Sequence, residues 1–164
     1  MVTRIIQAES QGLYEQDYYL WLRTTINQLR VGEFSAVDLD NLLAELEDMG
    51  RSQKRAVKSL LIKLLVHLLK LMCWEEERER NQGHWKGEIR TFRRQIKDEL
   101  ADSPSLKPYI LEIFEECYQE ARKEESDRSL LPLDKFPLIP IGSLAQILDE
   151  SWFPESDNQH NTIE

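Results

Sequence analysis

Three carboxylates and one histidine have the residue types from which a helical protein could build a catalytic site. Asp17, Glu45 and Glu47 flank apolar stripes in the first third of the chain. His67 lies at the edge of the polar sector of a very apolar segment. Helical bundles form metal sites from carboxylates and imidazoles on facing helices. A cluster of Asp17, Glu45 and His67 would therefore support a metal-dependent or other enzyme.

The same residues also have a plainer interpretation. The sequence contains no Glu-x-x-His pair, and His67 has no second histidine three or four residues away. Solvent-facing flanks of helices are normally charged, so the acids, with Asp48 beside them, are expected to pair with nearby Lys and Arg. His67 is then a boundary histidine that hydrogen-bonds a carboxylate or a backbone carbonyl. We favour this interpretation, and the sequence specifies no cofactor.

A basic stripe on a predicted helix over residues 84–101 gives a second candidate site. Its members fall within about 100° of arc and are Lys86, Arg90, Arg93, Arg94 and Lys97. Such a stripe could bind the phosphates of nucleic acid or another anion. It could instead pair with an acidic helix face in the same molecule or in a partner. The net charge of −9 favours pairing, because an acidic protein repels nucleic acid.

The composition is typical of a water-exposed helical protein with a real core. Of the 164 residues, 41% are hydrophobic and 31% charged. The longest apolar stretch, 60–74, is interrupted by Lys63, His67 and Lys70, so no membrane span is predicted. The N-terminus lacks the pattern of a secretory signal, and the two cysteines suggest no disulfide framework. A cytoplasmic location is expected.

Hydrophobic periodicity predicts helices at about 14–30, 38–49, 52–74 and 84–101, and a fifth that begins near Pro104. Gly50 is expected to end the second helix, and the charged stretch 75–83 is expected to be a loop. Three prolines between 130 and 140 predict an extended segment, followed by a short helix that Ser143 caps. Trp152 and Phe153 are expected to fold back onto the core.

These elements predict an all-α protein. We expect a compact bundle of about five to six helices around a central apolar helix at about 52–74, with an irregular, proline-containing C-terminal segment. Residues 13–153 are expected to form a single helical domain. A flexible lead at 1–12 and a disordered polar tail at 154–164 complete the predicted organisation.

Several spaced motifs resemble one known family. They are LYEQDYYLW at 13–21, LD at 39–40, ELEDMGRS at 45–52, HLLK at 67–70 and SPSL at 103–106. The chain resembles domain-of-unknown-function family 29, made of small, mostly cyanobacterial, uncharacterised helical proteins, over about residues 13–153. The resemblance implies an all-helical domain and supplies no reaction, cofactor or catalytic residue. It marks five positions to test first: Asp17, Glu45, Glu47, His67 and Trp85.

The leading hypothesis from the sequence is a non-enzymatic helical interaction module that self-associates. Acidic and basic helix faces and many boundary aromatic residues motivate it. The expected partner is another protein or a second copy of the chain. An enzyme centred on Asp17, Glu45 and His67, and an anion binder that uses the basic stripe, remain the alternatives.

Overall fold

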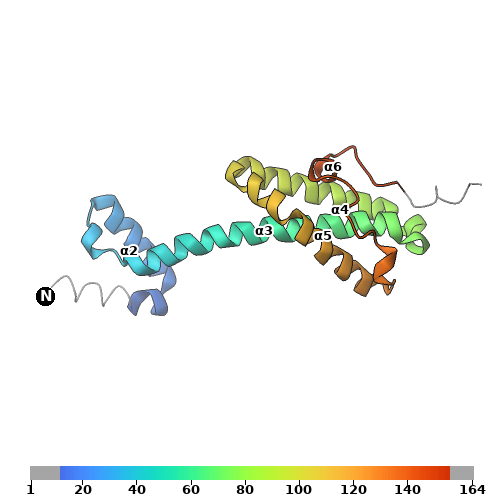
Figure 1. Ribbon diagram of the computed structural model, residues 1–164. Helices are drawn as coiled ribbons and strands as arrows, with labels where there is room; N and C mark the ends of the chain where they lie inside the picture. Colours follow the sequence, from blue (N-terminus) through green and yellow to red (C-terminus); the bar gives the residue numbers. More distant parts are fainter. Residues whose placement is uncertain (1–11, 156–164) are drawn as a thin grey trace, which may run out of the picture. The chain divides into compact units, whose positions relative to one another are not determined.

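A computed structural model describes residues 12–155, and every regular element within them is a helix (Figure 1). The all-α prediction is confirmed. The chain divides into two compact units, an N-terminal unit that ends at Gln53 and a C-terminal unit that begins at Lys54. The predicted lead and tail lie almost entirely outside the described residues. In residues 12–155, no helix is long and apolar enough to cross a membrane.

The first helix of the N-terminal unit is shorter than its hydrophobic pattern predicts. Residues 12–16 are helical, but α2 (Tyr18–Val31) begins only after Asp17, whose backbone has the non-helical angles φ −148° and ψ 86°. The Asp17 carboxylate accepts a hydrogen bond from the Leu20 amide at 2.9 Å and so caps α2. The predicted single helix over 14–30 is therefore wrong at its start. At the other end, Gly32 forms a left-handed cap with φ 80°.

A short 3₁₀ turn, η1 (Phe34–Ala36), connects α2 to α3 (Leu39–Cys73). The buried Asp38 carboxylate receives the Trp21 indole N–H at 3.3 Å and also accepts from the backbone of Asn41 at 3.4 Å. Asp38 thus lies at the start of α3, close to the predicted start of this helix. Its hydrogen bond joins the start of α3 to Trp21, the large buried side chain of α2.

The predicted break at Gly50 is wrong, since α3 runs without interruption through it. A glycine inside a helix costs only about 1 kcal/mol relative to alanine. The residues on either side, from Leu42 to Met49 and from Arg51 to Leu61, are mostly good helix formers. Their combined preference outweighs one glycine.

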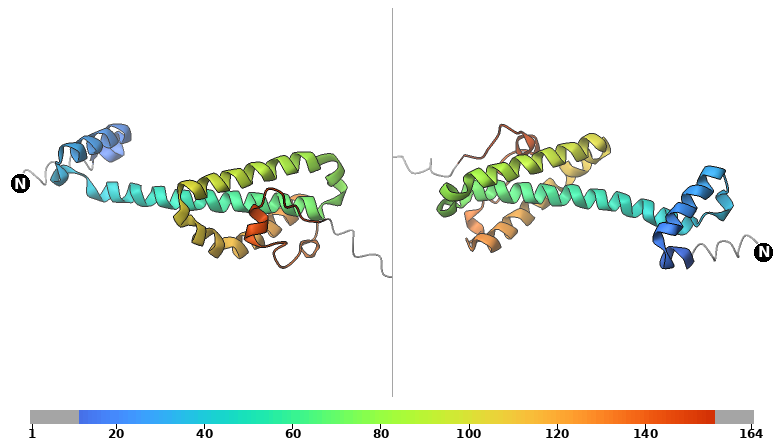
Figure 2. Two further views of the ribbon diagram at one scale, coloured as in Figure 1. Left: turned by 90° about the horizontal axis from the view of Figure 1, so that it is seen from above. Right: turned by 180° about the vertical axis from the view of Figure 1, so that it is seen from behind.

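In the C-terminal unit, α4 (Glu75–Asp102) and α5 (Lys107–Ser129) lie along the second half of α3 (Figures 1 and 2). The 3₁₀ turn η2 (Pro104–Leu106) joins them. Leucines on several sides of α3 are fully buried: Leu61, Leu64, Leu65, Leu68 and Leu69. The prediction of a central apolar helix is confirmed, and its C-terminal end falls at Cys73, within one residue of the predicted one.

The charged stretch 75–83 is helical rather than the predicted loop. Glu75, Glu76 and Glu77 form the first turn of α4. Carboxylates there are favourable because they face the positive end of the helix dipole. The run that reads as a fraying end is therefore the start of the next helix.

The C-terminal segment follows the predicted course. Leu130 ends α5 with φ 59°, and η3 (Leu133–Lys135) is the only short helix before α6 (Leu144–Leu148) in the described residues. The Ser143 hydroxyl accepts from the Gln146 amide in a capping box. Half-buried Trp152 and Phe153 pack against the core, as predicted.

Candidate functional site

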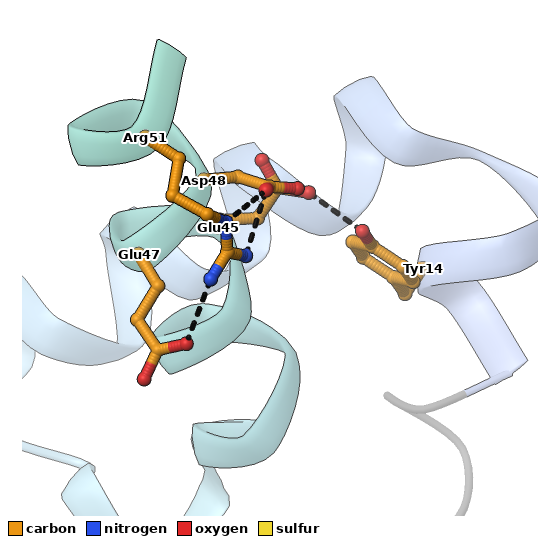
Figure 3. Close-up of polar contacts among 5 residues, drawn as sticks. All are labelled: Tyr14, Glu45, Glu47, Asp48 and Arg51. Atoms are coloured by element: carbon orange, nitrogen blue, oxygen red, sulfur yellow. Dashed lines mark hydrogen bonds and ion pairs between the residues drawn. The ribbon is translucent and has the colours of Figure 1, made fainter. Parts of the chain in front are cut away.

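Glu45 accepts hydrogen bonds from two tyrosines of the N-terminal unit, and Figure 3 shows the one from Tyr14. The Tyr14 hydroxyl donates to Glu45 Oε1 at 2.6 Å, and the Tyr18 hydroxyl donates to Oε2 at 2.9 Å. The hydrogen bond to the Glu45 carboxylate raises the pKa of Tyr14 to about 12. Both oxygens of Glu45 are therefore engaged in joining the N-terminal helical segments to α3.

Glu47 and Asp48 pair with a cation one turn away on α3 (Figure 3). Arg51 Nη2 lies 2.7 Å from Asp48 Oδ1, and Arg51 Nη1 lies 3.4 Å from Glu47 Oε2. All three side chains are more than half exposed. This geometry is that of surface ion pairs on one helix, which contribute little to stability.

His67 lies at the boundary of the C-terminal core. Its Nδ1 donates to the Lys63 carbonyl at 2.8 Å, and its ring packs edge-on against Phe92 at 5.2 Å. Burial lowers the pKa of His67 below its ordinary value. This environment is that of a boundary histidine hydrogen-bonded to a backbone carbonyl.

The three hypothesised ligands are divided between the two units of the chain. Asp17 and Glu45 belong to the N-terminal unit and His67 to the C-terminal unit. In the part of the chain that the structure describes, no three His, Cys, Asp or Glu side chains are placed to hold a metal ion. The enzyme hypothesis stays a prediction.

The basic stripe of α4 separates into buried and exposed members. Arg93 is completely buried, and its guanidinium donates to the carbonyls of Ile147 and Trp152, each at 2.8 Å. Sequence analysis places Arg93 on a surface stripe and misses this role. Its position between Ile89 and Ile96 on the apolar face of α4 is the signal that could have revealed it.

Other members of the stripe also contact the C-terminal segment. Lys97 Nζ lies 2.7 Å from Glu150 Oε1, and Lys86 Nζ lies 5.6 Å from the centre of the Phe153 ring. The acidic face of α5 pairs elsewhere, because Glu116 and Glu120 both contact Lys58 of α3. Arg90 and Arg94 are exposed. The partners of Arg93, Lys97 and Lys86 therefore belong to α6 and to the segment after it.

Two open grooves border the polar sector of α3 in the C-terminal unit. Their volumes are about 460 Å³ and about 360 Å³, and Ser59 and Lys63 line both. The larger groove also contains Asp98, and the smaller one contains Glu124. The larger groove, with Lys63 against Asp98 and Glu99, has no bias toward an anion, whereas the smaller one combines Arg55, Lys58 and Lys63 with the single carboxylate of Glu124.

An exposed apolar surface is the most distinctive feature of the N-terminal unit. We call its part on α3 the leucine stripe, formed by Leu39, Leu43, Leu46 and Met49, which are 56%, 50%, 55% and 67% exposed. Their spacing of three and four residues places them on one face of the helix. These residues belong to the hydrophobic pattern that predicts a helix at about 38–49, and the structure shows that they are exposed.

Other exposed apolar side chains of the N-terminal unit lie on α2 and η1: Tyr18, Tyr19, Leu20, Ile26, Leu29, Val31 and Phe34. Among the described residues of the N-terminal unit, the buried apolar side chains are Trp21 and Val37 alone. Single exposed leucines are common, but a row of four exposed apolar side chains along one helix face is typical of a binding surface.

A comparison with known protein families identifies the family of the chain. The model of the family described as Domain of unknown function DUF29 matches residues 13–153. No curated protein and no solved structure matches the chain. Since the match spans nearly all of the described residues in both units, the chain belongs to the DUF29 family.

Proposed function

We propose that this protein is a non-enzymatic helical interaction module that self-associates through the leucine stripe. The exposure of that stripe, beside a core as small as Trp21 and Val37, is the observation that carries the proposal. Compact units of about 40 residues rarely bury enough apolar surface to be stable without oligomerisation or another support. A second copy supplies the missing surface.

The energy available from such burial is substantial. Fully burying a leucine side chain contributes about 1.5–3 kcal/mol. Each of the four side chains of the leucine stripe leaves half or more of its surface in water, so a partner can cover much of it. In a symmetric dimer both copies contribute a stripe, which doubles the gain.

Light scattering on the full chain and two matched variants tests the proposal. Leu43→Lys places a charge in the leucine stripe, and Leu111→Lys makes the same change on α5, where Leu111 is 65% exposed. Both substitutions occur on exposed helix faces, so both variants should fold. We expect wild type and Leu111→Lys to be dimers at the same concentrations, and Leu43→Lys to be a monomer.

Circular dichroism confirms that the two variants keep their helices. If Leu43→Lys and Leu111→Lys have the same mass as wild type at every concentration, the leucine stripe is not the interface. If wild type is itself strictly monomeric, self-association is excluded as the function.

A further inference from the structure

The smaller of the two grooves lies wholly within the C-terminal unit and is lined mainly by basic side chains. Its volume is about 360 Å³. Five residues of α3 and one residue of α5 line it: Arg55, Lys58, Ser59, Ile62, Lys63 and Glu124. This local surplus of cations contrasts with the net charge of −9 of the whole chain. The groove is therefore a candidate site for an anionic ligand.

The carboxylates at and beside this groove are already paired with cations. Glu124 Oε1 lies 2.6 Å from Nη2 of Arg128, one turn further along α5. Glu116 Oε1 and Glu120 Oε1 lie 2.6 Å and 2.9 Å from the same atom, Lys58 Nζ. Because two glutamates share its ammonium, Lys58 offers little charge to a ligand.

Arg55 and Lys63 are the cations of the groove that remain available. Both are exposed, and neither forms an ion pair with another residue of the described range 12–155. Ser59 is exposed as well and lies between them, one helical turn from each. The spacing of four residues places the three side chains in a row on one face of α3, about 12 Å long.

The three side chains of this row provide the donors that phosphate oxygens accept. The Arg55 guanidinium can donate to two oxygens at once, the Lys63 ammonium adds a compact charge, and the Ser59 hydroxyl adds a further donor. Because two turns of helix separate the cations, they match two linked phosphoryl groups better than one. Half-buried Ile62 adds an apolar wall against which an organic part of the ligand can pack.

Acidic side chains around the groove limit the position and the size of the ligand. On the other side of Ser59 and Lys63, the larger groove contains Asp98 and Glu99 of α4. These carboxylates repel an anion, so the side toward α5 is the favourable one. A nucleic-acid backbone would extend past a groove of about 360 Å³ and meet the surrounding net negative charge. The arrangement therefore fits a small molecule rather than a long polyanion.

We propose that the smaller groove binds the diphosphate group of a small molecule, with Arg55 and Lys63 at the two phosphoryl groups and the Ser59 hydroxyl between them. The diphosphate is either inorganic pyrophosphate or part of a nucleotide. All residues of the site belong to the C-terminal unit, and none belongs to the leucine stripe. The binding is therefore tested independently of self-association.

Isothermal titration calorimetry on the full chain tests the site, in about 50 mM salt and without divalent cations, so that screening is modest. The separate probes are inorganic pyrophosphate, inorganic phosphate and adenosine diphosphate. We expect pyrophosphate to bind with a Kd on the order of 0.1–1 mM and phosphate to bind roughly tenfold more weakly. Tighter binding of adenosine diphosphate than of pyrophosphate would assign the ligand to nucleotides, and the reverse order would assign it to the inorganic ion.

Matched charge variants locate the binding. Arg55→Gln and Lys63→Gln each remove one cation from the groove and should weaken pyrophosphate binding about tenfold. Arg94→Gln makes the same change of net charge at an exposed position of α4 outside the groove, and should leave the Kd within about twofold of wild type. All three positions are exposed, so the variants should fold, and circular dichroism checks this.

Three results would overturn the proposal. The first is an absence of binding when pyrophosphate is present at about tenfold above the expected Kd. The second is equal weakening by Arg55→Gln and Arg94→Gln, which would show unspecific attraction to the net charge. The third is phosphate binding as tight as that of pyrophosphate, which would exclude recognition of a diphosphate.

Discussion

Arg93 of α4 donates a hydrogen bond from Nη2 to the carbonyl oxygen of Trp152 at 2.8 Å, and so fixes the segment after α6 to the core. The same guanidinium holds the Ile147 carbonyl through Nε. Burial lowers the pKa of Arg93 below its ordinary value, but an arginine remains charged at physiological pH. One buried guanidinium thus provides hydrogen bonds to backbone carbonyls that no strand or helix provides.

Arg93→Met should destabilise the fold by about 2–4 kcal/mol, because it leaves buried carbonyls without donors. Urea unfolding followed by circular dichroism measures the change. Arg94→Met is the matched control, since Arg94 is exposed and one residue away. Equal stability of the two variants would show that the bonds to Ile147 and Trp152 contribute nothing.

Glu125 should make stability fall as the pH rises from about 4.5 to 7. Its side chain is completely buried, neither carboxylate oxygen is hydrogen-bonded, and burial raises its pKa to about 7 despite Lys70 Nζ at 4.0 Å. The unfolded chain ionises this carboxyl at its ordinary pKa of 4.5, whereas the folded chain keeps the proton until about pH 7. Between these values the free energy of unfolding drops by up to about 1.4 kcal/mol per pH unit.

The variant Glu125→Gln isolates this effect. It should equal wild type below pH 4.5 and should be more stable by an amount on the order of 3 kcal/mol above pH 7, where wild type buries a charge. Thermal unfolding across this pH range provides the measurement, with exposed Glu124→Gln as the control. A constant difference between Glu125→Gln and wild type at all pH values would refute the buried ionisation.

Two glycines should respond oppositely to alanine. Gly83 lies inside α4, with open space where a Cβ would stand, so Gly83→Ala should stabilise by about 0.5–1 kcal/mol. Gly32 has φ 80°, so Gly32→Ala should destabilise by about 1 kcal/mol. Thermal melts of both variants make the comparison. Destabilisation by Gly83→Ala would contradict a helix over residues 75–83.

Tyr14→Phe should loosen the N-terminal unit, because it removes the donor to Glu45 Oε1. Hydrogen exchange of the amides in α2 and the first turns of α3 should become faster. Tyr19→Phe, on a side chain 68% exposed, should leave exchange unchanged. If both variants exchange at the wild-type rate, the bond between Tyr14 and Glu45 does not hold the helices together.

Much of the fold could be predicted from local signals. Periodic leucines identify the central helix, and Gly32 and Ser143 end or begin helices where their chemistry requires it. The continuation of α3 through Gly50 and the start of α4 at Glu75 could not be predicted in this way. Both depend on the sum of small helix preferences over many residues. A glycine that stops one helix is simply tolerated in another.

The candidate sites were harder to predict, because each depends on which face of a helix meets which neighbour. Arg93 shares a stripe with four surface cations, yet its guanidinium is buried under a segment more than fifty residues later. The leucine stripe has the pattern of a core face, and only the packed structure distinguishes exposure from burial. Hydrophobic periodicity predicts which face of a helix is apolar, but it does not predict which element packs against that face.

The mass of the wild-type chain in solution, measured by sedimentation equilibrium over a wide concentration range, tests the central claim most directly. The account predicts a reversible rise from the 19.4 kDa of one chain to twice that mass, abolished by Leu43→Lys and kept by Leu111→Lys. A mass that stays at 19.4 kDa at every concentration would contradict it.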